Sequence, residues 1–168
     1  LAIVFLKSLF KDRYDECVLE LNASDQRTLD TVRDIIKPFA FSMPPPEVPF
    51  KVCFLDEVDE TAPNTQPALR RIIEGLIDQN EPRRCRFILS CNNKQKIIEP
   101  IQSRCITFFI RPLPLLEITK CLRQIGLNEG INNVPYESIE EIANHSNGDL
   151  RRAINTFQTL VILFGNNI

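Results

Sequence analysis

The stretch that decides the fold is Lys-Val-Cys-Phe-Leu-Asp-Glu-Val-Asp-Glu, residues 51–60. The apolar run Val52–Leu55 is typical of a strand that is buried on both faces of a parallel sheet. Asp56 and Glu57 follow it directly, and carboxylates at the end of a buried strand are costly unless they have a partner. Mg²⁺ is a natural partner, because it binds one or two carboxylates together with phosphate oxygens and water. The simpler alternative is an acidic turn after a core strand.

Further apolar runs on either side of this stretch alternate with helical patterns. Strands are expected at Cys17–Leu21, Arg86–Cys91 and Cys105–Ile110, and helices at Leu1–Phe10, at the apolar positions 29–36 (capped by Ser24 or Asp25) and at Pro67–Leu76. This alternation indicates an α/β fold with an open, mostly parallel sheet. In such sheets ligands bind beyond the carboxyl ends of the strands. Asp56, Glu57 and Asn92 fall at those ends.

The pattern changes after Arg111–Pro114. Three helices are expected there, at Leu115–Ile125, Tyr136–His145 and Asp149–Phe164. The sequence therefore predicts two domains, an α/β domain over residues 1–112 and a small helical domain over residues 113–168.

Composition excludes several classes of protein. Of the 168 residues, 43% are hydrophobic and 25% charged, and no apolar run approaches the ~20 residues that span a bilayer. The six cysteines form no CxxC pair and His145 stands alone, which favours reduced core thiols in an intracellular protein. The net charge of −2 means that any contact with nucleic acid needs a local basic face.

Three polar residues could act with the acids, and each has a plainer alternative. Asn92 could hydrogen-bond a γ-phosphate or hold an attacking water, but asparagine also forms ordinary turns. Arg104 has no acidic neighbour in sequence and could neutralise charge on an adjoining subunit's nucleotide, or form a surface salt bridge. Arg151, in the first turn of the last helix, could reach a phosphate or be plain surface charge.

Six segments together resemble the small subunits of replication factor C, the AAA+ clamp-loader ATPases. They are ELNASDQR (20–27), FLDEVDE (54–60), QPALRRIIE (66–74), RFILSCNN (86–93), KIIEPIQSRC (96–105) and GDLRRAIN (148–155). The resemblance covers almost the whole chain. It implies an AAA+ P-loop NTPase-type parallel sheet with flanking helices, a three-helix lid domain, and ATP and Mg²⁺ as cofactors.

The resemblance also implies a role for each candidate residue. Asp56 and Glu57 match the Walker B acids, with Asp56 on the Mg²⁺ shell and Glu57 polarising the attacking water. Asn92 matches sensor 1, and Arg151 matches the sensor-2 arginine of the lid. Arg104 matches the arginine finger that acts in trans.

The implied partners are the other subunits of a pentamer, a sliding clamp and primer–template DNA, in the nucleus of a eukaryote or the cytoplasm of an archaeon, with no membrane. The helices after residues 22–25 and 61–64 are expected to face the DNA. Their basic residues Arg27, Arg33, Lys37, Arg70 and Arg71 are candidate phosphate contacts. Arg70 and Arg71 could instead stabilise the ATPase core or a subunit interface.

The chain departs from the family at both ends. No glycine is followed by Lys-Ser or Lys-Thr, so the phosphate loop is absent, as are the C-terminal collar helices. We therefore expect a fragment that binds ATP poorly or not at all by itself and does not hydrolyse it. Two alternatives stay open: a clamp-loader subunit that binds DNA without hydrolysing ATP, and another AAA+ DNA-processing ATPase.

Overall fold

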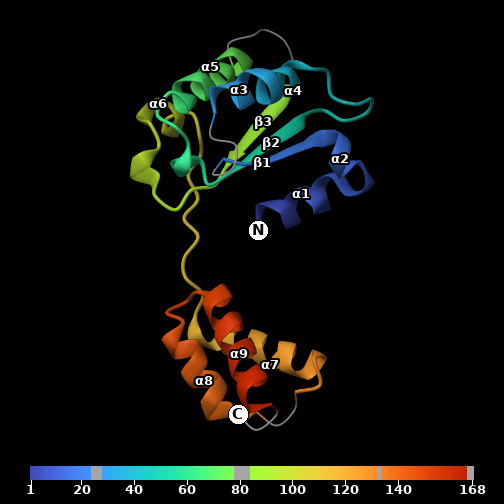
Figure 1. The fold of residues 1–168 in the computed structure, drawn as a ribbon. Helices are drawn as coiled ribbons and strands as arrows, with labels where there is room; N and C mark the ends of the chain where they lie inside the picture. Colours follow the sequence, from blue (N-terminus) through green and yellow to red (C-terminus); the bar gives the residue numbers. More distant parts are fainter. Residues whose placement is uncertain (24–27, 78–83, 132–133, 166–168) are drawn as a thin grey trace. The chain divides into compact units, whose positions relative to one another are not determined.

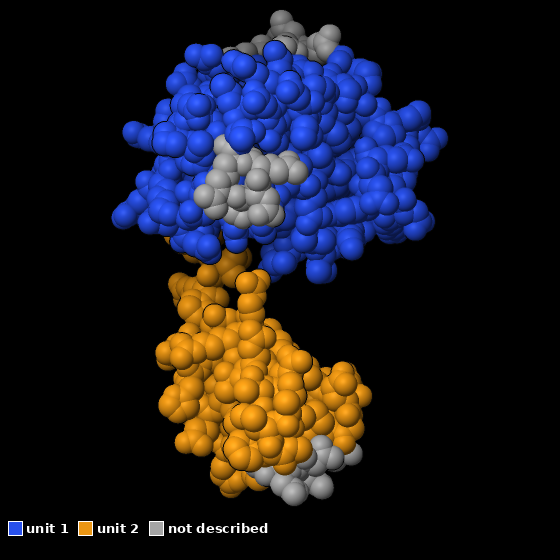
Figure 2. Space-filling model, viewed as in Figure 1, with its two compact units in different colours: residues 1–107 blue, residues 108–168 orange. Residues whose placement is uncertain are grey.

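The computed structural model describes residues 1–23, 28–77, 84–131 and 134–165. Contacts along the chain divide it into two compact units, residues 1–107 and residues 108–168, which are described separately below (Figures 1 and 2). The domain boundary expected between residues 112 and 113 lies a few residues beyond this division, and it stays a prediction.

The first unit is built around a three-stranded parallel sheet. Its strands are β1 (Val18–Asn22), β2 (Lys51–Asp56) and β3 (Cys85–Leu89), in the order β1-β2-β3. The central strand β2 is buried from Lys51 to Leu55, as its unbroken apolar run predicts. Asn22 lies opposite Asp56, so the carboxyl ends of β1 and β2 meet at one edge of the sheet.

Helices cover both faces of this sheet (Figure 1). One face carries α1 (Ala2–Phe10), the 3₁₀ turn η1 (Lys11–Arg13) and α2 (Tyr14–Cys17); the other carries α3 (Leu29–Thr31), the π-helical turn η2 (Val32–Ile36), α4 (Lys37–Phe41) and α5 (Thr65–Ile77). Successive side chains of a strand point to opposite faces. Accordingly, Val52 and Phe54 pack in a cluster with Leu6 of α1, whereas Cys53 and Leu55 pack in a cluster with the helices of the other face.

The predicted helix starts need two adjustments. The predicted caps Ser24 and Asp25 lie outside the described residues, and the described cap is Thr28, whose side chain accepts a hydrogen bond from the Thr31 amide at 3.4 Å. The helix α5 begins at Thr65, ahead of the predicted start at Pro67. Proline is therefore in the first turn, where its missing N–H leaves no helical hydrogen bond unmade.

The strand predicted at Cys105–Ile110 is wrong. After β3 the described chain forms the 3₁₀ turn η4 (Lys94–Lys96) and the short helix α6 (Glu99–Gln102), and residues 106–110 pair with no described strand. The side chains of Ile106 and Phe108 are 84% and 80% exposed. Apolar and β-branched residues favour a strand only where a neighbouring strand supplies hydrogen bonds and a surface to pack on.

The second unit consists of the three predicted helices, α7 (Leu115–Asn128), α8 (Tyr136–His145) and α9 (Leu150–Phe164). Ile118 and Leu122 of α7, Ile142 of α8 and Phe157 of α9 form its core. None of the helices in the described parts of the chain is both long and apolar enough to cross a membrane.

Candidate functional site

Asp56 ends β2 at the carboxyl edge of the sheet, where its carboxylate is held by two donors. Oδ1 accepts a hydrogen bond from the Ser90 hydroxyl, just after β3, and another from the Glu57 amide at 3.2 Å. A carboxylate offers about four acceptor positions on its two oxygens. Two donors on one oxygen therefore fix the group and leave acceptor capacity for a cation, and the residues present fit a Mg²⁺ ion bound by a single carboxylate.

Glu57 has a left-handed backbone, with φ 56° and ψ 42°. This conformation is uncommon outside glycine and costs on the order of 1 kcal/mol, so it persists only where the surroundings hold it. Here the Glu57 amide also reaches the Ser90 hydroxyl at 3.3 Å, and the Val58 amide donates to the Ser90 carbonyl at 3.0 Å. The turn after β2 is therefore tied to the end of β3, which fixes where Glu57 leaves the sheet.

Asp59 brings the predicted residue Asn92 to the same edge. Its side chain is 6% exposed, and its two oxygens accept hydrogen bonds from the Asn92 amide at 3.3 Å and the Asn93 amide at 2.9 Å. The loop after β2, which forms the 3₁₀ turn η3 (Val58–Glu60), thereby holds the loop after β3. The structure thus groups Asp56, Glu57 and the Asn92 backbone along one edge of the sheet.

Sequence reasoning missed Ser90 and Asp59, although both hold predicted residues in place. One signal was available, because Asp59 is the third acid of a stretch in which only Asp56 and Glu57 were assigned a role. A buried third carboxylate requires hydrogen-bond donors. Ser90 gave no such signal, since a serine after a strand is common in any turn.

Arg104 lies just after α6 and is paired, which matches the alternative of a salt bridge. One terminal nitrogen donates to the Pro100 carbonyl at 2.7 Å and to Ser103 Oγ at 3.3 Å, and the other contacts Glu74 Oε1 of α5 at 2.6 Å. The Nε of Arg70 reaches the same Glu74 oxygen at 2.9 Å. The acidic partner was missed because it lies on a different helix, far upstream in the sequence.

The other basic candidates differ in their exposure to solvent and in their ion pairs. Arg33 and Lys37 are exposed on η2 and α4, and Arg71 is exposed on α5, whereas Arg70 is partly buried in its ion pair with Glu74. Arg27 lies outside the described residues. The pairing of Arg70 matches the alternative in which this residue stabilises the ATPase core.

Arg151 is exposed in the first turn of α9. Its role toward the sheet stays a prediction.

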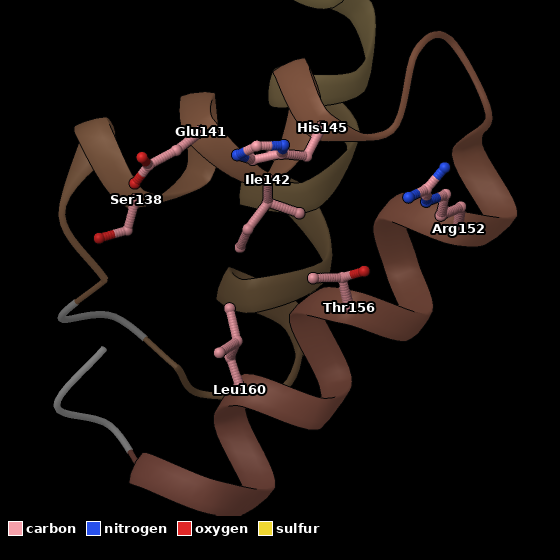
Figure 3. A pocket seen from close by; sticks show the side chains of 7 residues that line it. All are labelled: Ser138, Glu141, Ile142, His145, Arg152, Thr156 and Leu160. Carbon is pink, nitrogen blue, oxygen red and sulfur yellow. The ribbon is translucent and has the colours of Figure 1, made fainter.

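A cleft of about 490 Å³ opens between α8 and α9 (Figure 3). It is lined by Ser138, Glu141, Ile142, His145, Arg152, Thr156 and Leu160. None of the predicted site residues is among them.

Three of the six cysteines follow the expectation of core thiols, and Cys105 and Cys121 are only partly buried. Cys17, Cys53 and Cys85 are buried and free, and burial raises the pKa of the Cys85 thiol to about 11. Cys91 is the exception: it was expected in a buried strand, but β3 ends at Leu89 and Cys91 is exposed. Among the described residues no cluster of three or more His, Cys, Asp or Glu could hold a metal.

A parallel sheet with acids at its carboxyl edge, followed by a three-helix unit, defines the class of AAA+ ATPases with a lid domain. Residues 5–113 match the model of the ATPase family associated with various cellular activities (AAA), and residues 120–162 match that of the RCF1/5-like, AAA+ ATPase lid domain. The chain belongs to the AAA family.

Within that family the chain is a homologue of the small subunits of replication factor C. It is 44% identical over 158 residues to the replication factor C small subunit of Methanococcus vannielii, covering 94% of this chain and 48% of the relative. The small subunit of Aeropyrum pernix is 43% identical over 150 residues, covering 89% and 44%. The chain thus spans about half the length of these curated relatives.

Solved structures support the same fold. The Holliday junction branch migration motor RuvB of Thermotoga maritima superimposes with a TM-score of 0.70 and 15% sequence identity, covering 100% of this chain and 54% of that one. At this identity the likeness shows the AAA+ fold and nothing of the function.

Proposed function

We propose that the chain is the ATPase part of a clamp-loader subunit, which uses ATP binding and hydrolysis to place a sliding clamp on primer–template DNA. The observation that carries the proposal is the arrangement of Asp56 and Glu57 at the carboxyl edge of the sheet, held by Ser90. The identity of 40–44% to small subunits of replication factor C supports the same conclusion.

Each of the residues at this edge has its own role in hydrolysis. Asp56 holds Mg²⁺, whose charge neutralises the phosphate oxygens of ATP when both are bound. Glu57 accepts a hydrogen bond from the attacking water and polarises it. Asn92 donates its side-chain amide to the γ-phosphate or to that water. The hydrogen bonds to Asp56 and to the Asn92 backbone keep these groups in place before ATP arrives.

Two arginines act on the nucleotide from outside this edge. Arg104 reaches the ATP of the adjoining subunit in the assembled pentamer and stabilises the charge that develops during phosphoryl transfer. Arg151 contributes from the lid to the ATP of its own subunit. DNA phosphates meet the exposed basic residues Arg33, Lys37 and Arg71, joined by Arg27 and Arg70.

The role of Arg104 is tested in the full-length protein assembled with its partner subunits. Arg104→Ala is expected to lower turnover at the neighbouring site by about 10³-fold, because an arginine finger contributes at least that much. Nucleotide affinity on the same subunit is expected to stay unchanged. Loss of nucleotide binding on its own subunit would show instead that Arg104 acts in cis.

A second candidate is a clamp-loader subunit that binds DNA and its partners without hydrolysing ATP. The presence of Glu57 argues against it, since a subunit that does not hydrolyse ATP has no use for a water-polarising acid. Clamp loading by a complex that carries Glu57→Gln separates the two candidates.

A further inference from the structure

Glu74 connects the two arginines of the first unit that the proposed function assigns to different ligands. It lies on α5, one helical turn after Arg70, and its side chain is 22% exposed. Oε1 contacts Arg70 Nε at 2.9 Å and a terminal nitrogen of Arg104 at 2.6 Å. The hydrogen bond from Arg70, followed by the charges of Arg104, Arg70 and Arg71, lowers the pKa of Glu74, so the carboxylate is ionised at neutral pH.

This pairing fixes the direction of the Arg104 side chain. Glu74 of α5 holds one terminal nitrogen, and Pro100 of α6 holds the other at 2.7 Å. Without these contacts a long arginine side chain has more rotamer entropy to lose before it can act. The side chain is one-third exposed, so it is held from its protein side while part of it faces outward.

The cluster keeps a positive charge for an incoming phosphate. Two guanidinium groups, Arg70 and Arg104, share one carboxylate, so the three side chains together carry a charge of +1. A guanidinium has five N–H donors, and the contacts with Glu74, Pro100 and Ser103 leave donors for a further acceptor. Glu74 therefore orients Arg104 without neutralising the cluster.

We propose that Glu74 is a positioning residue, which holds the Arg104 guanidinium from α5 in the direction needed to meet a phosphate of the adjoining subunit's ATP. This inference rests on the proposed function, because it requires Arg104 to act in trans. Glu74 itself touches no nucleotide and acts only through Arg104.

The test uses the full-length protein in its complex and measures kcat, the KM for ATP and nucleotide affinity on the same subunit. Glu74→Ala is expected to lower kcat about tenfold, because misplacing a catalytic group by about 1 Å costs up to 10²-fold. The KM is expected to stay unchanged, and thermal unfolding of the variant checks that the lower kcat does not come from a smaller folded fraction. Glu74→Gln is expected to lose less but still to be slower than the natural protein, since its amide oxygen accepts a hydrogen bond from Arg104 but lacks the charge that attracts both guanidinium groups.

Two further variants show whether Glu74 acts through Arg104. The double variant Glu74→Ala/Arg104→Ala is expected to be no slower than Arg104→Ala, because a residue that works only through another adds nothing once that one is gone. Glu117→Gln removes an exposed ion pair with Lys120 in the other unit and is the matched control, with unchanged kcat expected.

The possible outcomes separate this inference from the proposed function. If Arg104→Ala leaves turnover unchanged, the trans role fails, and the inference fails with it. If Arg104→Ala slows turnover but Glu74→Ala does not, or speeds it, only the inference is overturned, and a faster variant would mean that Glu74 restrains Arg104. If thermal unfolding shows that Glu74→Ala does not fold, Glu74→Gln decides: a lower kcat supports the inference and an unchanged kcat overturns it.

Discussion

At the residue scale, Asp59 shows how one buried carboxylate can connect two loops at the carboxyl edge of the sheet. Its carboxylate oxygens accept hydrogen bonds from the backbone amides of Asn92 and Asn93, in the loop after β3. Asp59→Ala would remove both hydrogen bonds, and a hydrogen bond to a charged group contributes about 1.5–3 kcal/mol. We expect the free energy of unfolding, measured by denaturant titration, to fall by about that amount.

The neighbouring Glu60 provides the control for this prediction. Its carboxylate pairs with Lys96 at 2.7 Å, but both side chains are about half exposed. Exposed ion pairs contribute about 0–1 kcal/mol. Glu60→Ala is therefore expected to destabilise the protein less than Asp59→Ala, and equal losses would contradict the role assigned to Asp59.

The sequence could predict the residues of the site that carry their own signal. Asp56 and Glu57 were recognisable because two acids end an apolar run, and the structure places them at the sheet edge. Ser90, Asp59 and Glu74 were not recognised, because what matters about them is a partner far away in the chain. Such partners appear only once the sheet and α5 bring the segments together.

At the element scale, a tyrosine joins α2 to β1. The Tyr14 hydroxyl donates to Glu20 at 2.9 Å, and burial, followed by this hydrogen bond, raises the Tyr14 pKa to about 12. The unfolded value is about 10. Folding therefore favours the neutral phenol, and this contribution to stability is complete below pH ~10 and is lost as the pH rises toward the folded pKa.

Ultraviolet titration of phenolate tests this assignment. The chain has two tyrosines, Tyr14 and Tyr136. In the Tyr136→Phe variant, the remaining phenolate of Tyr14 is expected to appear later in the titration than a free tyrosine. A normal titration of Tyr14 in this variant would contradict the hydrogen bond to Glu20.

The last helix provides a second prediction at this scale. Asp149 precedes α9, and its side chain accepts a hydrogen bond from the Arg152 amide at 3.1 Å. Removing such a cap costs about 1 kcal/mol. We expect Asp149→Ala to lower the thermal stability of the helical unit by that amount, and Asp149→Asn to retain most of it, since asparagine caps equally well. Equal losses in both variants would contradict capping.

The helices and strands also show which elements could be predicted from the sequence and which could not. The strands β1, β2 and β3 were predicted because each is a run of mostly apolar residues. The three helices of the second unit were predicted because their apolar residues recur at helical spacing. The run at 105–110 has the same composition as a strand but no partner among the described strands. Composition is a property of one segment, whereas a strand forms only when a second segment pairs with it.

At the scale of the whole molecule, the resemblance to clamp loaders implies a nucleotide held between several parts. The 168 residues supply the acids and the lid but no Gly-Lys-Ser or Gly-Lys-Thr motif, whose backbone amides and lysine would bind the phosphates. We expect these residues alone to bind ATP weakly or not at all and to show no turnover, as measured by calorimetry and phosphate release. Measurable turnover by the isolated chain would contradict this expectation.

The most direct test of the central claim, that Glu57 activates water for hydrolysis of ATP, is the Glu57→Gln variant of the full-length protein in its complex. Glutamine keeps the size of the side chain but loses the charge that polarises water. We predict that ATP still binds to this subunit with unchanged affinity, while hydrolysis at its site falls by at least about 10²-fold. Unchanged hydrolysis would contradict the account and leave a subunit that serves its complex without catalysis.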